Sequence, residues 1–172
     1  MVAIDRGDIT KLEIDAIVNA ANSSLLGGGG VDGAIHRAAG RGLYEECKKL
    51  NGCRVGEAKI TGAHNMKHIK HVIHTVGPQV HGAVSDEQRK QLKSCYIESL
   101  KLAVANNLRS VAFPCISTGI YGYPNDDACN VVVTSILAWL KENQDKVDRI
   151  VFVTFLDKDY DLYEKCLKEK LS

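Results

Sequence analysis

The sequence has no excess of charge of either sign, no long hydrophobic run and no paired cysteine motif. Its 22 lysines and arginines nearly balance 21 aspartates and glutamates, giving a formal net charge of +1. This balance argues against a broad electrostatic grip on nucleic acid or an anionic membrane. No stretch approaches the roughly 20 apolar residues of a membrane-spanning helix, and Asp5 and Asp8 follow Met1 closely, unlike a secretory signal. We therefore expect an intracellular protein, cytoplasmic or nuclear, with neither nucleic acid nor membrane as a direct partner.

Cysteines are present but form no CxxC pair, and most of the six lie within apolar patterns. Such spacing is typical of reduced, packed thiols and not of a disulfide framework or a zinc site. A chain of 172 residues with 45% hydrophobic residues can bury a sizeable core without crosslinks. We expect one domain over residues 1–172, a monomer, that needs neither metal nor cofactor.

Strand-like and helical stretches alternate along the chain, which predicts an α/β sheet covered by helices on both faces. Asn51 and Gly52 are expected to end the first helix, and Asn125 or Asp126 to cap the third. The expected strands cover residues 15–18, 58–61, 71–76, 110–116 and 149–155, and the expected helices cover residues 31–50, 86–106, 125–143 and 157–171.

Four consecutive glycines, Gly27 to Gly30, separate the first strand from the first helix. A flexible linker is disfavoured because the glycines lie within the first third of one domain. The stretch from Gly28 to Gly33 satisfies GxGxxG, but residues 20–26 separate it from the strand, and no acidic residue ends a second strand near Cys53. The remaining interpretation is a phosphate cradle, in which backbone N–H groups and a helix N-terminus bind an anion without lysines.

A second loop of the same character, residues 117–124, follows the strand at 110–116. Taken alone it could equally be a plain turn between a strand and a helix. Loops at the carboxyl ends of neighbouring strands can close on one ligand from two sides, which is where α/β sheets usually bind ligands. The pair of loops therefore favours a ligand site.

Both loops belong to a set of segments that match a known family: Gly7 to Thr10, Asn19 to Asn22, Gly27 to Gly40, His74 to Pro78 and Pro114 to Gly122. In these segments the chain resembles the macrodomains, and specifically those of the MacroD type. This resemblance implies a three-layer α/β/α fold with a central mixed sheet. It also implies binding of ADP-ribose, hydrolysis of the ester that joins ADP-ribose to Asp or Glu side chains of mono-ADP-ribosylated proteins, and deacetylation of O-acetyl-ADP-ribose.

The resemblance also assigns binding roles to individual residues. Asp8 would accept a hydrogen bond from the adenine amino group beside the backbone of Ile9, although the same residue could simply cap a turn. Phe155 would flank the adenine, although an apolar residue at a strand end is more often plain core. Asn22 would bind the hydroxyls of the distal ribose, and Tyr121 would pack against that sugar. The diphosphate would rest on the backbone of Gly28, Gly29, Gly30 and Val31, and of Ser117, Thr118, Gly119, Ile120 and Tyr121.

Asp32 is a carboxylate beside a site built for anions. A diphosphate repels it, so Asp32 is not expected to serve binding, and like charges raise the pKa of a carboxyl group. A raised pKa suits a base near neutrality. We hypothesise that Asp32 orients or deprotonates a water held against a phosphate oxygen, which can share the base role, with Asn22 also needed for turnover. Without the resemblance, a helix N-cap is the plainer interpretation of Asp32.

Two other functions remain to be weighed against a hydrolase. A binding-only reader of ADP-ribose or of poly-ADP-ribose ends would not need a carboxylate beside the phosphates. A nucleotide-dependent dehydrogenase would need the acidic ribose partner that the sequence lacks.

Several further residues invite a chemical role that their context does not favour. His68, His71 and His74 are spaced by three, but strand side chains alternate with a period of two, so a metal site is not expected. Cys115 is interpreted as a buried strand thiol and not as a nucleophile. His36 has no adjacent serine or cysteine to activate, and we expect it to pack beneath the glycine loop.

Overall fold

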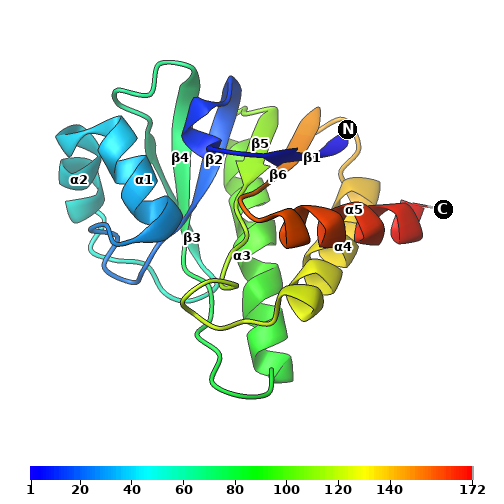
Figure 1. The fold of residues 1–172 in the computed structure, drawn as a ribbon. Helices are drawn as coiled ribbons and strands as arrows, with labels where there is room; N and C mark the ends of the chain where they lie inside the picture. Colours follow the sequence, from blue (N-terminus) through cyan, green and yellow to red (C-terminus); the bar gives the residue numbers. More distant parts are fainter. Residues whose placement is uncertain (172) are drawn as a thin grey trace.

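The computed structural model describes residues 1–171 and contains one six-stranded sheet (Figure 1). The strand order is β1-β6-β5-β2-β4-β3. All neighbouring strands are parallel except β3 and β4, so the sheet is mixed, as predicted. The strands are β1 (Val2–Arg6), β2 (Ile14–Ala20), β3 (Ala58–Gly62), β4 (Ile69–Thr75), β5 (Ser110–Phe113) and β6 (Arg149–Thr154).

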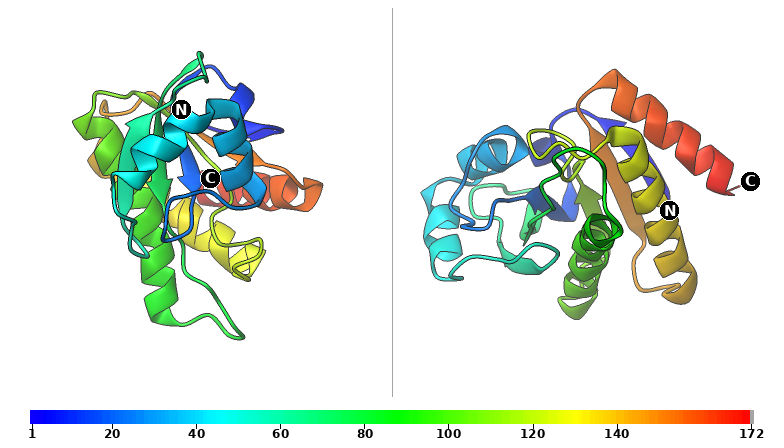
Figure 2. Two further views of the ribbon diagram at one scale, coloured as in Figure 1. Left: turned by 90° about the vertical axis from the view of Figure 1, so that its left-hand side faces the viewer. Right: turned by 90° about the horizontal axis from the view of Figure 1, so that it is seen from below.

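Helices cover both faces of this sheet, because its central strands bury side chains on both sides (Figure 2). Residues alternate between two cores: Ala16 and Val18 of β2 lie in one, and Ile17 lies in the other. The first core is covered by α3 (Asp86–Ala105), α4 (Asn125–Glu142) and α5 (Asp157–Leu171), and the second by α1 (Gly30–Ala39) and α2 (Arg41–Lys48). The three-layer α/β/α arrangement is thus confirmed. Within residues 1–171, we find no helix with the length and hydropathy needed to cross a bilayer.

The helix predicted over residues 31–50 is two helices, and that prediction is wrong at Gly40. Gly40 has φ +86° and ψ −177°, a conformation that interrupts the helix between Ala39 and Arg41. A Cβ on Gly40 would lie 2.6 Å from Nδ2 of Asn65, in the turn between β3 and β4. The break lets α2 turn back against this hairpin. The second helix ends at Lys48, with Lys49 as its C-cap, slightly before the predicted end at Asn51 and Gly52, which both have positive φ.

Gly40→Ala is expected to lower the free energy of unfolding by about 1–3 kcal/mol, because alanine meets both an unfavourable φ and the Asn65 amide. Chemical denaturation monitored by circular dichroism measures this loss. Gly119→Ala is the matched control, since Gly119 has no atom within 4 Å of an added Cβ and its φ is not positive. Equal stability of the two variants would contradict the prediction.

Other features of the fold also differ from the sequence analysis. The strand predicted to reach residue 116 ends at Phe113, before Pro114, which has no N–H to donate to a ladder. Neither Asn125 nor Asp126 caps α4: Pro124 occupies the N-cap position, and the Asn125 side chain donates instead to Asp159 Oδ1. The sequence analysis missed β1, which pairs with β6, the last strand along the chain.

Candidate functional site

A cavity with a volume of about 830 Å³ runs along the carboxyl edge of the sheet. Its walls come from the segments that follow the five mutually parallel strands: residues 7–9 after β1, 20–34 after β2, Gly77 after β4, 114–121 after β5 and 153–159 from the end of β6. Parallel strands place their carboxyl ends at one edge, and ligands of α/β sheets bind there. Every residue assigned to the site from sequence lies on this wall; their individual roles remain predictions.

The strand order arranges these residues along the cavity. Asp8 after β1 and Phe155 after β6 lie at one end, the 117–121 loop after β5 lies in the middle, and Asn22 and Asp32 after β2 lie at the other end. Three strand spacings of about 4.8 Å separate β1 from β2, roughly 14 Å in total. The cavity therefore suits an elongated ligand with different chemistry at its two ends.

At the first end, Asp8 acts as a cap and also faces the cavity. It is the N-cap of the short 3₁₀ helix Ile9–Lys11, and its Oδ1 accepts hydrogen bonds from the Thr10 N–H (2.9 Å) and the Thr10 hydroxyl (2.6 Å). The hydroxyl bond is the largest influence on Asp8 and lowers its pKa, so the side chain remains an ionised acceptor. Phe155 is 87% exposed, so the plain core interpretation is wrong, and its ring is free to cover a flat ligand group.

The glycine loop ends at the start of a helix, as a phosphate cradle requires. Gly29 is the N-cap of α1, so the first N–H groups of the helix lack intrahelical acceptors and lie on the cavity wall. Asn22 shapes this loop: its Nδ2 donates to the Gly27 carbonyl (2.8 Å), and its Oδ1 accepts from the Ser24 N–H and hydroxyl. Asn22 therefore already braces the loop, and one N–H of its amide remains for a ligand.

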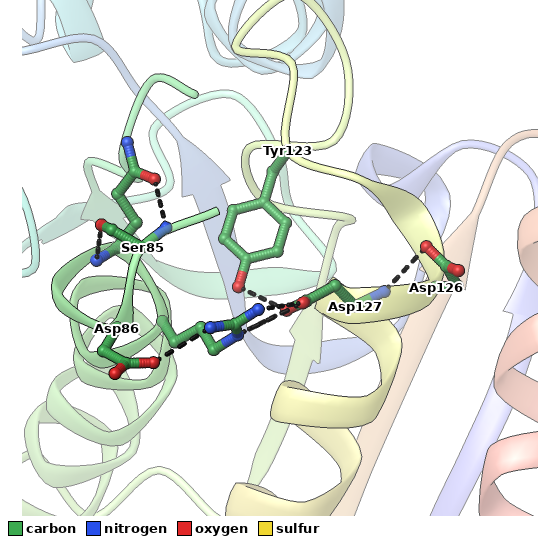
Figure 3. A network of polar contacts seen from close by, with 7 residues as sticks. Ser85, Asp86, Tyr123, Asp126 and Asp127 are labelled. Carbon is green, nitrogen blue, oxygen red and sulfur yellow. Dashed lines mark hydrogen bonds and ion pairs between the residues drawn. The ribbon is translucent and has the colours of Figure 1, made fainter. Parts of the chain in front are cut away.

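The second loop is tied down at both of its ends. Ser117 has φ +69° and is buried, the Tyr123 N–H donates to the Ser117 carbonyl, and the Val80 N–H donates to the Tyr121 carbonyl (2.7 Å). A polar network then holds Tyr123 to the start of α4 (Figure 3). The Tyr123 hydroxyl donates to Asp127 Oδ1 (2.9 Å), and Asp127 also accepts from Nε and Nη2 of Arg89 on α3. The network fixes where the backbone donors of the loop point.

Asp32 is buried in the first turn of α1, at 4% exposure. Burial raises its pKa, although a hydrogen bond from Asn19 Nδ2 to Oδ1 (2.8 Å) and the nearby His36 oppose the shift. The sequence analysis expected a bound diphosphate to raise the pKa of Asp32. In the structure, burial already raises this pKa without a diphosphate. Gly29, and not Asp32, is the N-cap, so the capping interpretation of Asp32 is wrong.

Sequence reasoning missed a buried chain of polar groups behind Asp32. Asn19 Nδ2 lies 3.1 Å from His74 Nδ1, and His74 Nε2 lies 2.9 Å from the Thr61 hydroxyl. Burial lowers the pKa of His74 to about 3, so its ring is neutral. Since an amide nitrogen only donates, Nδ1 accepts and Nε2 carries the proton. Asn19 is thereby held in the orientation that donates to Asp32.

His36 lies against the same carboxylate. Its Nε2 is 3.4 Å from Asp32 Oδ1, although the two atoms are not aligned for a hydrogen bond. A Cβ on Gly27 would lie 3.7 Å from the His36 ring, so His36 packs under the glycine loop as expected. Two features of the sequence could have indicated these residues. Asn19 lies close to Asn22 along the chain, and His36 lies one helical turn after Asp32.

The other reactive side chains occupy different settings. Cys115 is not a strand thiol: it follows β5, half-buried on the cavity wall, and burial together with the charge of Asp159 raises its pKa to about 12. The three histidines point to different surroundings, with His68 exposed, His71 beside the Thr61 carbonyl and His74 buried. Residues 1–171 contain no cluster of three or more His, Cys, Asp or Glu side chains arranged to hold a metal ion.

Several known proteins are similar to this chain in sequence and in fold. Residues 18–132 match the family model described as "Macro domain". The chain is 57% identical over 166 residues to ADP-ribose glycohydrolase MACROD1 of Bos taurus, covering 96% of this chain and 51% of that protein. It is 55% identical over 168 residues to ADP-ribose glycohydrolase MACROD2 of Xenopus laevis, covering 98% of this chain and 40% of that protein. The chain therefore spans about half the length of these relatives or less.

A solved structure has the same fold and contains a bound ligand. The Trypanosoma brucei macrodomain in complex with ADP-ribose superposes with a TM-score of 0.90 at 43% identity. The match covers 96% of this chain and 68% of that one. The sheet and the loops at its carboxyl edge thus belong to a fold that is known to hold such a molecule in that relative.

Proposed function

Since the chain belongs to the macro domain family, we propose that its cavity binds ADP-ribose and that the protein removes mono-ADP-ribose from Asp and Glu side chains of modified proteins. Deacetylation of O-acetyl-ADP-ribose follows from the same chemistry, because both substrates are esters of the distal ribose. The observation that carries the proposal is Asp32, a buried carboxylate with a raised pKa on the wall of a cavity where the start of α1 and the 117–121 loop also lie.

The residues supply distinct parts of this reaction. The start of α1 and the loop from Ser117 to Tyr121 hold the diphosphate through backbone N–H groups, which need no lysine. Asn22 donates its remaining amide proton to a hydroxyl of the distal ribose. Ionised Asp32 accepts a proton from the attacking water or orients it, and Asn19 fixes the carboxylate. Because the reactive form is the ionised one, the rate falls as the pH drops through the pKa of Asp32.

The alternative is a reader that binds ADP-ribose without turning it over. Incubation with a protein mono-ADP-ribosylated on glutamate, with released ADP-ribose followed over time, distinguishes the two. We expect multiple turnovers that leave the target protein unmodified. Binding of ADP-ribose in calorimetry without any release from the modified protein would establish the reader and refute the hydrolase.

We also propose an intracellular location and monomeric action on mono-ADP-ribosylated proteins. All six cysteines are free, and four of them are buried, which suits a reducing compartment. Imaging of the tagged protein in cells tests the location, and light scattering tests the monomer.

A further inference from the structure

A second, shallower depression lies on the outer side of α1 and α2, with a volume of about 360 Å³. It is open to solvent and is lined by Leu26, His36, Arg37, Gly40, Arg41 and Tyr44. We propose that this depression binds an acidic segment of the ADP-ribosylated protein, close in sequence to the modified side chain. The inference rests on the proposed function, because it concerns the polypeptide part of that substrate.

The depression adjoins the reacting end of the main cavity. His36 lines the depression and lies 3.4 Å from Asp32, which lines the cavity. Leu26 lies at its edge, two residues before Gly28 of the cavity wall. The Arg37 guanidinium lies over the first turn of α1, since a Cβ on Gly33 would lie 3.0 Å from its Nη1. Only the glycine loop and the first turn of α1 therefore separate the two hollows.

The charge of the depression fits a carboxylate-rich segment. Arg37 and Arg41 both lie on its wall and are exposed, and a planar guanidinium binds carboxylates with two parallel hydrogen bonds. Glu45 is 3.2 Å from Arg41, but this pair is exposed (82% and 50% for the two side chains), so it is weak and exchanges readily for another carboxylate. Glu46, the next acid on α2, pairs with His64 instead. With a net charge of only +1 on the whole chain, this positive site is local.

The depression also carries aromatic and apolar side chains that a bound peptide can contact. The Arg41 guanidinium lies 5.6 Å from the centre of the Tyr44 ring, and Leu26 is 39% exposed. In the proposed reaction the modified glutamate ends at the distal ribose beside Asp32, so the protein must leave the cavity at this end. Each extended residue adds about 3.3 Å, so residues a few positions from the modified one reach the depression.

The test compares two peptides that carry one ADP-ribosylated glutamate, one flanked by further glutamates and one by glutamines. For the unaltered protein we expect KM for the acidic peptide to be about three- to tenfold lower. In Arg37→Gln/Arg41→Gln this preference should disappear, while turnover of O-acetyl-ADP-ribose, which has no peptide, stays unchanged. High salt should weaken the preference in the unaltered protein, because exposed charges are screened.

Lys90→Gln/Lys93→Gln is the matched control, since it removes two exposed charges from α3 on the other face of the sheet and should keep the preference. If the arginine variant keeps the unaltered preference, or if the control loses it equally, the assignment of the depression is overturned. If the unaltered protein hydrolyses none of the three substrates (the two peptides and O-acetyl-ADP-ribose), the proposed function itself is refuted. The two failures are therefore distinguishable.

Discussion

Asp32→Asn is expected to lower the release of ADP-ribose from a glutamate-modified protein by at least about 100-fold, because an amide cannot accept the proton of the attacking water. The affinity for ADP-ribose should stay the same or rise, since a negative charge close to the diphosphate is removed. Steady-state release and calorimetry on the same preparation measure the two effects. Unchanged turnover would remove Asp32 from the mechanism, and loss of affinity would make it a binding residue.

The same substitution has an expected effect on stability. Burial raises the pKa of Asp32, so between its ordinary value near 3.9 and the raised value the folded state binds more protons than the unfolded state. Stability then falls as the pH rises through that window, and the ionised group at neutral pH opposes folding. Asparagine removes the buried charge and still accepts from Asn19. We expect Asp32→Asn to unfold at an equal or higher temperature at pH 7, an advantage that vanishes in acid.

Asp148→Asn is the control of opposite sign. Asp148 accepts two hydrogen bonds from Arg109, and these lower its pKa, so its contribution to stability is present at neutral pH and lost as the pH falls. The variant should unfold at a lower temperature at pH 7 with unchanged turnover. A lower unfolding temperature for Asp32→Asn at pH 7 would show that its carboxylate stabilises the fold, against the expectation.

Gly77→Ala is expected to weaken ADP-ribose binding by at least about tenfold. An added Cβ would lie 2.0 Å from Ser117 Oγ and 2.7 Å from Ile116 Cγ2, so the second loop must move. Ser117 is buried with positive φ, and its neighbours supply the donors for the diphosphate, so a shift of about 1 Å misaligns them. Calorimetry with ADP-ribose measures the loss.

Two further variants define the cause of that loss. Gly62→Ala on β3 should bind normally, because its Cβ meets nothing closer than 3.7 Å. Ser117→Gly in the Gly77→Ala background removes the nearest obstacle and relieves the positive φ, so it should restore part of the affinity. If Gly77→Ala binds as well as the unaltered protein, the loop is not fixed by this contact.

The sequence predicted most of the layers because hydrophobic periodicity is a local signal. The helix predicted over residues 86–106 is α3, and its buried residues, among them Leu92, Tyr96 and Ala103, follow the 3.6-residue period. The break at Gly40 was missed, because its cause is a close approach to Asn65, which is distant in sequence. β1 was missed for a similar reason: it is short, half-exposed and defined by its pairing with β6.

The site shows the same division between local and distant causes. Glycines before a helix start and small residues after a strand indicated both loops, and their residues do line one cavity. The polar chain from Asp32 through Asn19 to His74 and Thr61 joins α1, β2, β4 and β3, and no spacing along the sequence reveals it. Gly77 lies in the matching segment His74 to Pro78, but the sequence did not explain why a glycine is needed there. The structure explains it, because an added Cβ would meet Ser117.

The pairing of β1 with β6 has a consequence for biosynthesis. Asp8 and Phe155, which frame the end assigned to the nucleobase, follow two strands that pair residues far apart in the sequence, such as Val2 with Ile150. On the ribosome, the two glycine-bearing loops emerge well before this end can close, because β6 is made after all the other strands of the sheet. A nascent chain should therefore bind nucleotides only after β6 has been made, too late for such a ligand to assist the folding of the earlier strands.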